Sequence, residues 1–467
     1  MKIILLTPNT RSAYVRSIPL GLLYIAASLR EAGFSDIRII DSRIHDLTHK
    51  VIVRRIKDFA PDVVGISAMS LDSLEVHELA GLVKGINPQS KVVVGGAYAT
   101  SSPECIIQDP HIDFVVMGEG ERTACNLMDA LENGKDVSGI DGLAFKHNGK
   151  PIMNPQKIFI ENIDSLPFPA WNFINLEGYF NNKNRHSENP TPASNRIAPL
   201  FTSRGCPFGC TYCHNIFGKK VRLRSVQNVI EEIELLIKKH DVGEIEIIDD
   251  IFNFDLTRAK QICDEIVKRG IKIKLSFPNG LRVDAMDEEL IVKLKQAGTH
   301  LIFYAIESAS ARVQKRIRKN LDLDKVRRII QYTAQQGIIV GGFFMLGFPE
   351  ETKDEMLQTI RFARELPFLI ADFFYVTPRP NTPLFEEMKS KYRELDELSI
   401  HQYHVFSFNA SAVSDAELKK IRARAFREFY LRPAQLWRIC KTMPNKKTLL
   451  WYAFVMFKRC ITGTGVY

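Results

Sequence analysis

Residues 203–213 read SRGCPFGCTYC and place Cys206, Cys210 and Cys213 in a C-x3-C-x2-C spacing. Three thiolates within eight residues can hold one face of a metal cluster, and thiolates select iron–sulfur clusters or zinc. Structural zinc favours four ligands, often as paired C-x2-C motifs. The other cysteines are scattered singly, and His214 is poorly placed as a fourth ligand. The spacing therefore favours an iron–sulfur cluster with one open iron over zinc or inert thiols.

The cysteine stretch follows the first strand of a strand–helix alternation. Runs rich in β-branched and aromatic residues predict six strands, at 199–203, 244–248, 272–277, 300–305, 338–345 and 371–376. Helical patterns lie between them, at 226–240, 255–269, 287–297, 323–336 and 354–365. Six such units predict an incomplete parallel α/β barrel, whose site lies at the carboxyl ends of the strands.

The first 145 residues show a second alternation. Short strands are predicted at 2–6, 37–41, 62–67, 91–95 and 114–117, with helices at 20–32, 49–59, 74–85 and 121–133. This pattern predicts a doubly wound, Rossmann-like sheet that binds a ligand beyond the strand carboxyl ends. The loops there are rich in glycine and small hydroxyl residues, although a glycine that merely ends a strand remains the alternative for any one loop. No G-x-G-x-x-G follows the first strand, so the dinucleotide fingerprint is absent.

The cysteine spacing, with an aromatic residue before the last cysteine, resembles the radical S-adenosylmethionine (SAM) superfamily. The resemblance covers nearly the whole chain and implies a partial (β/α)6 barrel of the TIM type. It also implies a [4Fe–4S] cluster whose open iron chelates the amino and carboxylate groups of SAM. In that superfamily a reduced flavodoxin or ferredoxin supplies the electron that cleaves SAM, and the 5′-deoxyadenosyl radical then abstracts hydrogen from the substrate.

Further positions carry over from the superfamily one by one. Asp249 and Asp250, in a DD-x-F stretch, resemble the SAM amino contact, and Arg282 resembles the arginine near the SAM carboxylate. The pair Glu307-Ser308 resembles the ribose-binding segment, with Ala309 in place of the usual glycine. Tyr212 is expected near adenine or the cluster, and residues 341–350 resemble the turn under adenine. The alternative for the acidic positions is a helix cap at a strand end.

A doubly wound domain before such a barrel resembles the cobalamin-binding class, in which methylcobalamin delivers a methyl group to the substrate radical. The resemblance implies cobalamin contacts along the strand-end loops, at Leu20, Gly21, Ser67, Ser70, Gly95, Gly96, Gly118, Glu119 and Gly120. One departure concerns the D-x-H-x-x-G motif, because residues 7–18 hold no histidine. His45 and His49 follow the second strand and are interpreted as surface residues. The class also contains members that bind cobalamin without this motif.

The charge is concentrated at one end. Residues 415–467 hold 12 Lys/Arg and 3 Asp/Glu, which equals the net charge of +9 of all 467 residues. The sequence predicts a cobalamin-binding domain at 1–145, a proline-punctuated linker at 146–198, a barrel at 199–395 and a basic, mostly helical extension at 396–467. The extension resembles that of the anaerobic magnesium-protoporphyrin cyclase and hopanoid-modifying branches. It is expected either to dock on the barrel with solvated arginines or to lie at a membrane interface.

These features favour a cobalamin-dependent radical SAM methyltransferase acting on an unactivated carbon of a small or lipid-like substrate. The alternative is an enzyme of the same architecture that cyclises, rearranges or oxidises its substrate. An iron–sulfur electron carrier would need no SAM pocket. A nucleic-acid modifier would carry more cluster cysteines and an RNA-binding appendage, and the body of this chain is neutral. No export signal or spanning segment is recognised, so a cytoplasmic location, with peripheral membrane contact, is expected.

Overall fold

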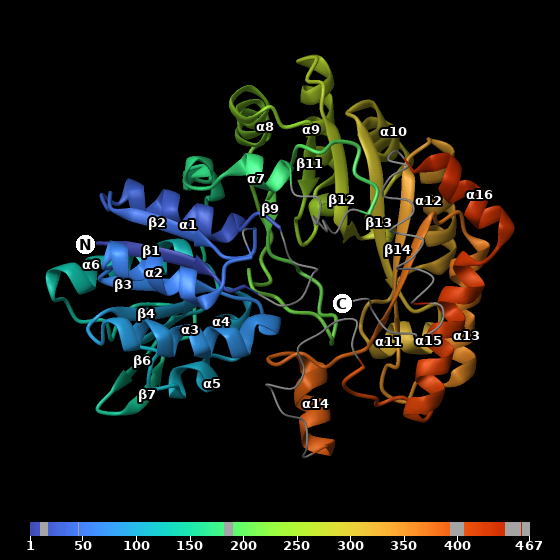
Figure 1. The fold of residues 1–467 in the computed structure, drawn as a ribbon. Helices are drawn as coiled ribbons and strands as arrows, with labels where there is room; N and C mark the ends of the chain where they lie inside the picture. Colours follow the sequence, from blue (N-terminus) through green and yellow to red (C-terminus); the bar gives the residue numbers. More distant parts are fainter. Residues whose placement is uncertain (10–16, 45, 182–189, 393–405, 444–458, 460–467) are drawn as a thin grey trace. The chain divides into compact units, whose positions relative to one another are not determined.

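The computed structural model describes residues 1–9, 17–44, 46–181, 190–392, 406–443 and 459 (Figure 1). Within these residues the chain forms two compact units. The first comprises residues 1–181 together with 214–218, and the second comprises the remainder. The described helices include none that is long and apolar enough to cross a membrane.

The first unit is built on a seven-stranded sheet with the strand order β2-β1-β3-β4-β5-β6-β7. The first five strands are parallel, as the alternation predicts, and they are β1 (Ile3–Thr7), β2 (Ile37–Asp41), β3 (Val63–Ser67), β4 (Lys91–Gly95) and β5 (Phe114–Val116). Neighbouring residues of one strand enter different cores, with Val64 in one and Val63 in the other. The sheet is therefore covered on both faces, which confirms the doubly wound fold.

Helices cover the two faces of this sheet. One core includes side chains of α2 (His49–Phe59), α3 (Ser73–Ile86) and α5 (Pro103–Gln108), and the other includes those of α1 (Leu20–Glu31) and α6 (Gly120–Asn133). The shorter helices of this unit are η1 (Ser70–Asp72), α4 (Ala97–Ser101), η2 (Ile163–Ser165), η3 (Trp171–Phe173) and α7 (Leu176–Phe180).

Two antiparallel strands at the sheet edge were not predicted. β6 (Leu143–His147) and β7 (Lys150–Met153) form a hairpin that begins in the last residues of the predicted domain 1–145 and continues into the stretch interpreted as a linker. Asn148 and Gly149 connect them, both with positive φ, at 51° and 74°. An Asn-Gly pair with left-handed backbone is the preferred two-residue hairpin turn, so the signal was present in the sequence.

The second unit contains the predicted barrel strands in chain order. Six strands pair in parallel in the order β15-β14-β13-β12-β11-β8. They are β8 (Ile197–Leu200), β11 (Glu244–Ile247), β12 (Lys274–Leu281), β13 (Thr299–Glu307), β14 (Ile339–Leu346) and β15 (Ile370–Tyr375). Because β8 and β15 do not pair with each other, the barrel is incomplete, as predicted, and each of these strands has an open edge.

The helices of the barrel alternate with its strands (Figure 1). They are α8 (Val226–His240), η4 (Phe252–Phe254), α9 (Leu256–Lys268), η5 (Val283–Ala285), α10 (Glu288–Gln296), α11 (Ala311–Arg316), α12 (Leu323–Gln335), α13 (Lys353–Glu365) and α14 (Pro383–Lys391). Two short strands, β9 (Ser203–Arg204) and β10 (Arg222–Leu223), pair antiparallel and enclose the cysteine segment.

The described part of the extension forms two helices, in agreement with a mostly helical segment. They are α15 (Asp415–Tyr430) and α16 (Pro433–Thr442), and Pro433 stands in the first turn of the second. A proline cannot continue a helix because it lacks the N–H and its ring clashes with the preceding turn, yet it fits the first turn of a new one. The apolar run LLWYAFVMF at 449–457 lies outside the described residues.

Helix α15 covers the open edge of β15. The Tyr430 hydroxyl accepts the Ala371 N–H at 3.0 Å and donates to the carbonyl of the same residue at 3.1 Å. Arg422 is fully buried, and its Nε donates to the Phe373 carbonyl at 2.5 Å. Side chains of the extension thus replace the missing neighbouring strand. The docked alternative is confirmed for α15, although this arginine is buried rather than solvated.

Candidate functional site

The cysteine segment is fastened to the barrel by both backbone polar groups of Thr211, which lies between Cys210 and Cys213. The Thr211 N–H donates to the Ile317 carbonyl at 3.1 Å, and the Thr211 carbonyl accepts the Leu384 N–H at 2.9 Å. Gly205, with φ at +91°, turns the chain out of β9 into this segment. Cys206 and Cys210 are half-buried and Cys213 is exposed, so the three thiols line a supported loop beyond the strand carboxyl ends.

The thiols are arranged for something larger than one metal ion. Four thiolates around a single zinc at 2.3 Å would lie about 3.8 Å apart. Within the described part of the chain, the three cysteine sulfurs do not gather within 4.8 Å of one another. Although the residue Cys213 is exposed, protein surrounds most of its thiol; this burial, and then the charge of Cys210, raises the pKa of the Cys213 thiol to about 12. A multi-iron cluster suits the spacing of the three sulfurs.

Adjacent carboxylates at the end of β11 have different environments. The Asp249 carboxylate is buried and accepts the Thr202 N–H at 2.6 Å, the Thr202 hydroxyl at 2.5 Å and the Ser203 hydroxyl at 2.6 Å. Asp250 is exposed, and the contact recorded for its carboxylate is a long hydrogen bond of 3.3 Å from the Gly205 N–H. Although the residue Asp250 is exposed, protein surrounds most of its carboxyl group; this burial, and then the charge of Asp249, raises the pKa of Asp250 to about 6. Asp250 is the open carboxylate of the pair.

Arg282 has most of its donors engaged. Its guanidinium pairs with Asp284 at 2.8 Å and donates to the Lys319 carbonyl at 2.8 Å. The guanidinium carbon also lies 3.7 Å from the centroid of the Phe208 ring, between the cluster cysteines. These contacts tie the cysteine segment to the loop of Lys319. The predicted contact of Arg282 with the SAM carboxylate stays a prediction.

Glu307 is brought to the cysteine segment by a distortion of β13. The pairing of β13 with β14 shifts register between Ala305 and Glu307, and Glu307 has φ at +68°. Its carboxylate accepts the Tyr212 hydroxyl at 3.1 Å and the Lys319 ammonium at 2.8 Å. The structure thus brings two predicted site residues into contact. Ser308 is fully buried, with its hydroxyl 3.3 Å from that of Thr359.

In the first unit the predicted cobalamin loops stand at the carboxyl ends of the strands. Ser67 and Ser70 are half-buried. A Cβ on Gly96 would meet the Ala68 carbonyl oxygen at 2.7 Å, so this glycine permits close packing between two loops. A Cβ on Gly95 would meet nothing nearer than 3.9 Å, and one on Gly21 nothing within 4 Å. Gly21 and Gly95 are therefore the more open of these positions.

Glu119 is engaged in hydrogen bonds with other parts of the chain. Its carboxylate accepts the Ile160 N–H at 2.9 Å, and the Gln156 side chain bonds to both its N–H and its carbonyl. A Cβ on Gly118 would meet the Gln156 amide oxygen at 2.0 Å. A Cβ on Gly120 would meet the Ile25 side chain at 2.9 Å, and Leu20 is buried. These four positions are packed against protein, and their role toward cobalamin stays a prediction.

Sequence reasoning missed a buried polar group at the ends of β1 and β2. The Thr7 hydroxyl donates to Asp41 at 2.9 Å, and the Arg43 guanidinium pairs with Asp72 at 2.7 Å. Among the described residues, Asp41 Oδ2, Ser42 Oγ and Asp72 Oδ1 are buried without a hydrogen-bond partner. Burial raises the pKa of Asp72 to about 6. The run Asp41-Ser42-Arg43 directly after a predicted strand was the available signal.

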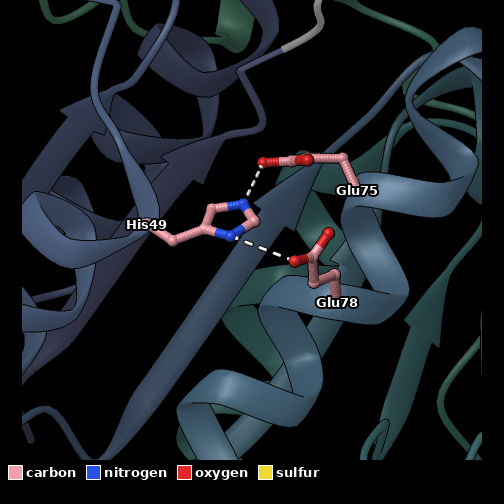
Figure 2. A group of neighbouring side chains, drawn as sticks. All are labelled: His49, Glu75 and Glu78. Atoms are coloured by element: carbon pink, nitrogen blue, oxygen red, sulfur yellow. Dashed lines mark hydrogen bonds and ion pairs between the residues drawn. The ribbon is translucent and has the colours of Figure 1, made fainter.

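His49 is half-buried between two glutamates rather than free at the surface. Its Nε2 lies 2.6 Å from Glu75 and its Nδ1 lies 3.2 Å from Glu78, both on α3 (Figure 2). The described residues contain no other group of His, Cys, Asp and Glu close enough to hold one ion. Because each ring nitrogen faces a different carboxylate, hydrogen bonding between α2 and α3 explains the arrangement. His45 lies outside the described residues.

Comparison with known proteins shows the family of this chain. A family model described as B12 binding domain matches residues 7–128, and one described as Radical SAM superfamily matches residues 200–363. An uncharacterized methyltransferase of Pyrococcus horikoshii is 35% identical over 446 residues, covering 93% of this chain and 94% of that protein. The chain belongs to the B12-binding radical SAM enzymes.

Two other relatives of this B12-binding radical SAM enzyme are named for different reactions, one a methyltransferase and one a cyclase. Cytidylyl-2-hydroxyethylphosphonate methyltransferase of Streptomyces wedmorensis is 31% identical, covering 83% of this chain and 81% of that protein. The anaerobic magnesium-protoporphyrin IX monomethyl ester cyclase of Rubrivivax gelatinosus is 26% identical, covering 96% and 81%. The predicted family and its cofactors, a [4Fe–4S] cluster, SAM and cobalamin, are confirmed.

A solved structure supports the fold. The cobalamin-dependent SAM radical enzyme OxsB, with aqua-cobalamin and SAM bound, matches with a TM-score of 0.74. The match covers 98% of this chain and 75% of that one at 16% identity, so the likeness concerns the fold.

Proposed function

We propose that this enzyme transfers a methyl group to an unactivated carbon of a small-molecule substrate. The observation that carries the proposal is the supported loop of three thiols on a six-stranded half-barrel that follows a B12-binding unit. When bound, the cluster, SAM and cobalamin supply hydrogen abstraction and a transferable methyl group. Methyl transfer is supported by the Pyrococcus horikoshii relative, which is named a methyltransferase and 94% of which is covered by the match to this chain.

The residues present fit these cofactors. Cys206, Cys210 and Cys213 would hold the cluster through soft sulfur donors. The open carboxylate of Asp250 is suited to an ammonium group such as the SAM amine. The buried oxygens of Asp41, Ser42 and Asp72 that lack partners within the described residues are acceptors for N–H donors, which the amide side chains of cobalamin offer. Contacts at Ser67, Ser70, Gly21 and Gly95 are part of the same proposal.

An aromatic surface would shelter the substrate. Phe344 and Phe373 stack on each other, and Phe373 packs against Phe426 of α15, so these two side chains face the helices. Successive side chains of a strand point to opposite faces, and Phe343 and Phe374 therefore face the inside of the half-barrel. The Phe343 ring lies 4.6 Å from that of Phe303 and 5.8 Å from that of Phe374. Such a wall excludes water from a reactive radical.

The test uses anaerobically purified, reconstituted enzyme. We expect about four irons per chain and a corrin absorption band, with iron lost from a variant carrying C206A, C210A and C213A. A C105A and C263A variant is the matched control and keeps its iron. Iron that survives the triple substitution contradicts the ligand assignment, and a chain that never retains cobalamin contradicts methyl transfer.

A second candidate is cyclisation or oxidation without methyl transfer. It is favoured by the cyclase of Rubrivivax gelatinosus, which matches 96% of this chain. Incubation with SAM that carries a deuterated methyl group and with cell extract distinguishes the two. Methyl transfer places three deuterium atoms in the product, whereas cyclisation or oxidation places none.

We also propose that a reduced flavodoxin or ferredoxin supplies the electron that cleaves SAM. We further propose that the enzyme lies in the cytoplasm and contacts an anionic membrane through α16. Leu436 and Trp437 on this helix are 47% and 71% exposed, and Lys441 follows one turn later. Apolar and basic groups on one helix favour an anionic lipid surface. Flotation with anionic liposomes should fall for L436S/W437S and not for the equally apolar, exposed control L74S/F254S. Equal flotation of the two contradicts membrane contact.

A further inference from the structure

Lys319 stands in a loop whose backbone is held in an uncommon conformation. The two residues beside it, Arg318 and Asn320, have φ at +56° and +51°. The loop is fixed by Gln314, whose carbonyl accepts the N–H groups of Lys319 and Asn320 at 3.1 and 3.3 Å. Arg282 adds a bond to the Lys319 carbonyl at 2.8 Å. Left-handed residues cost free energy and persist where the surrounding structure fixes them, often at functional sites.

The ammonium group of Lys319 completes a closed set of three contacts. It lies 2.8 Å from the Glu307 carboxylate and 3.3 Å from the Tyr212 hydroxyl, while Tyr212 and Glu307 are 3.1 Å apart. The Lys319 residue is only 6% exposed. An isolated ammonium would not be buried in this way, because removing its charge from water is unfavourable unless the charge is paired. The loop and β13 are therefore both distorted to bring these groups together.

This set of contacts adjoins the cysteine segment. Tyr212 immediately precedes Cys213, and Thr211 is bonded to Ile317, two residues before Lys319. The Lys319 ammonium is therefore held beside the residue that precedes Cys213. Two further cations near the cysteine segment are Arg282, which pairs with Asp284, and the exposed Lys219, which donates to the Phe208 carbonyl. Of these three cations, Lys319 is the buried one.

We propose that Lys319 is a positioning residue that fixes Glu307 and Tyr212 beside the cluster and that its charge sets the reduction potential of the cluster. Reduction adds an electron to a group already surrounded by thiolates. A nearby cation stabilises the reduced form, and a nearby carboxylate destabilises it. The proposal rests on the proposed function, because it requires that Cys206, Cys210 and Cys213 hold the cluster.

The experiment is a redox titration of the reconstituted cluster, without SAM, followed by the electron paramagnetic resonance of the reduced state. K319M should shift the midpoint potential to more negative values, and E307Q should shift it to more positive values. The double variant should return close to the wild type, since it removes both charges. K315M, which removes an exposed charge from α11 in the same segment, is the matched control and should leave the potential unchanged.

The outcomes separate this inference from the proposed function. A wild-type protein without iron overturns the proposed function. If the wild type holds a normal cluster and the midpoint potential of K319M equals that of K315M, the proposed role of Lys319 is overturned. If K319M does not retain its cluster, the midpoint potential of E307Q tests the proposal instead. A potential in E307Q that is unchanged or more negative than in the wild type also overturns the proposal. K319R keeps the charge and should restore most of the wild-type potential.

Discussion

Two adjacent aspartates at the end of β11 look alike in the sequence and differ in what surrounds them. The Asp249 carboxylate accepts hydrogen bonds from Thr202 and Ser203, whereas Asp250 is exposed. Sequence reasoning named both as SAM contacts because a DD-x-F stretch contains no sign of which side chain turns inward. The three donors that face Asp249 are found only in the fold, because they come from a strand end 46 and 47 residues earlier.

The two positions should therefore respond differently to substitution. D249N replaces one acceptor oxygen by a donor and leaves buried hydroxyl and N–H groups unsatisfied, at a cost of about 2 kcal/mol. D250N should leave stability unchanged and weaken SAM binding. Urea unfolding of the apo protein and equilibrium binding of SAM to the reconstituted enzyme measure the two effects. Equal stability of both variants would show that the bonds of Asp249 contribute nothing.

Helix α13 shows how one element is fixed at its start. Thr352 caps the helix, and Glu355 returns a bond to the Thr352 N–H at 2.9 Å while pairing with Arg312 at 2.6 Å. Hydrogen bonds from Arg312, ahead of the opposing effect of burial, lower the pKa of Glu355 to about 2. A folded pKa below the unfolded value of 4.5 means that the contribution to stability is present above pH 4.5 and is lost between pH 4.5 and 2.

E355Q should remove this dependence on pH. Because Arg312 is half-exposed, water weakens the ion pair, and we expect a loss of about 1 kcal/mol at pH 7 from the pair, since glutamine can keep the capping box. The difference between E355Q and wild type should shrink as the pH falls toward 2. Urea unfolding of the apo protein at several pH values measures it. A difference that is the same at pH 7 and pH 3 would argue against an ionised Glu355 as its source.

Elements with strong periodicity were predictable, and those set by single contacts were not. The six barrel strands and the cysteine loop follow from apolar runs and spacing. The hairpin of β6 and β7 was predictable from its Asn-Gly turn, but this turn was assigned to a proline-rich linker. Lys319 gave no sequence signal, since a lysine after a short helix resembles any solvated charge. Its burial arises from the bulge that moves Glu307 and from the left-handed residues beside it.

At the scale of the whole molecule, the basic tail is largely structural where the structure describes it. Arg422 is buried at the edge of β15, and Arg459, 4% exposed, pairs with Asp372 of the same strand at 2.7 Å. Arg432 and Arg438 donate to backbone carbonyls of Arg364 and Pro367. Part of the charge that characterises the sequence is therefore used to complete the barrel.

Removal of the extension tests this role. A chain that ends at residue 414 lacks both edge-capping helices and leaves β15 with unpaired N–H and carbonyl groups beside exposed Phe373 and Phe344. An exposed, apolar edge strand pairs with other chains. We expect this truncated protein to form soluble oligomers or aggregates, whereas L436S/W437S stays monodisperse. Size-exclusion chromatography with light scattering measures both, and a monodisperse truncated chain would refute the capping role.

The cap on β15 also has a consequence in time. Tyr430, which bonds both polar groups of Ala371, is encoded 59 residues later. Ribosomes add about 5–20 residues per second, so the cap is completed roughly 3–12 s after the strand. During this interval the strand edge of every newly made chain is open to its neighbours on the same messenger RNA. The yield of folded enzyme should then depend on how densely ribosomes are loaded and on how fast they translate the codons for residues 372–430.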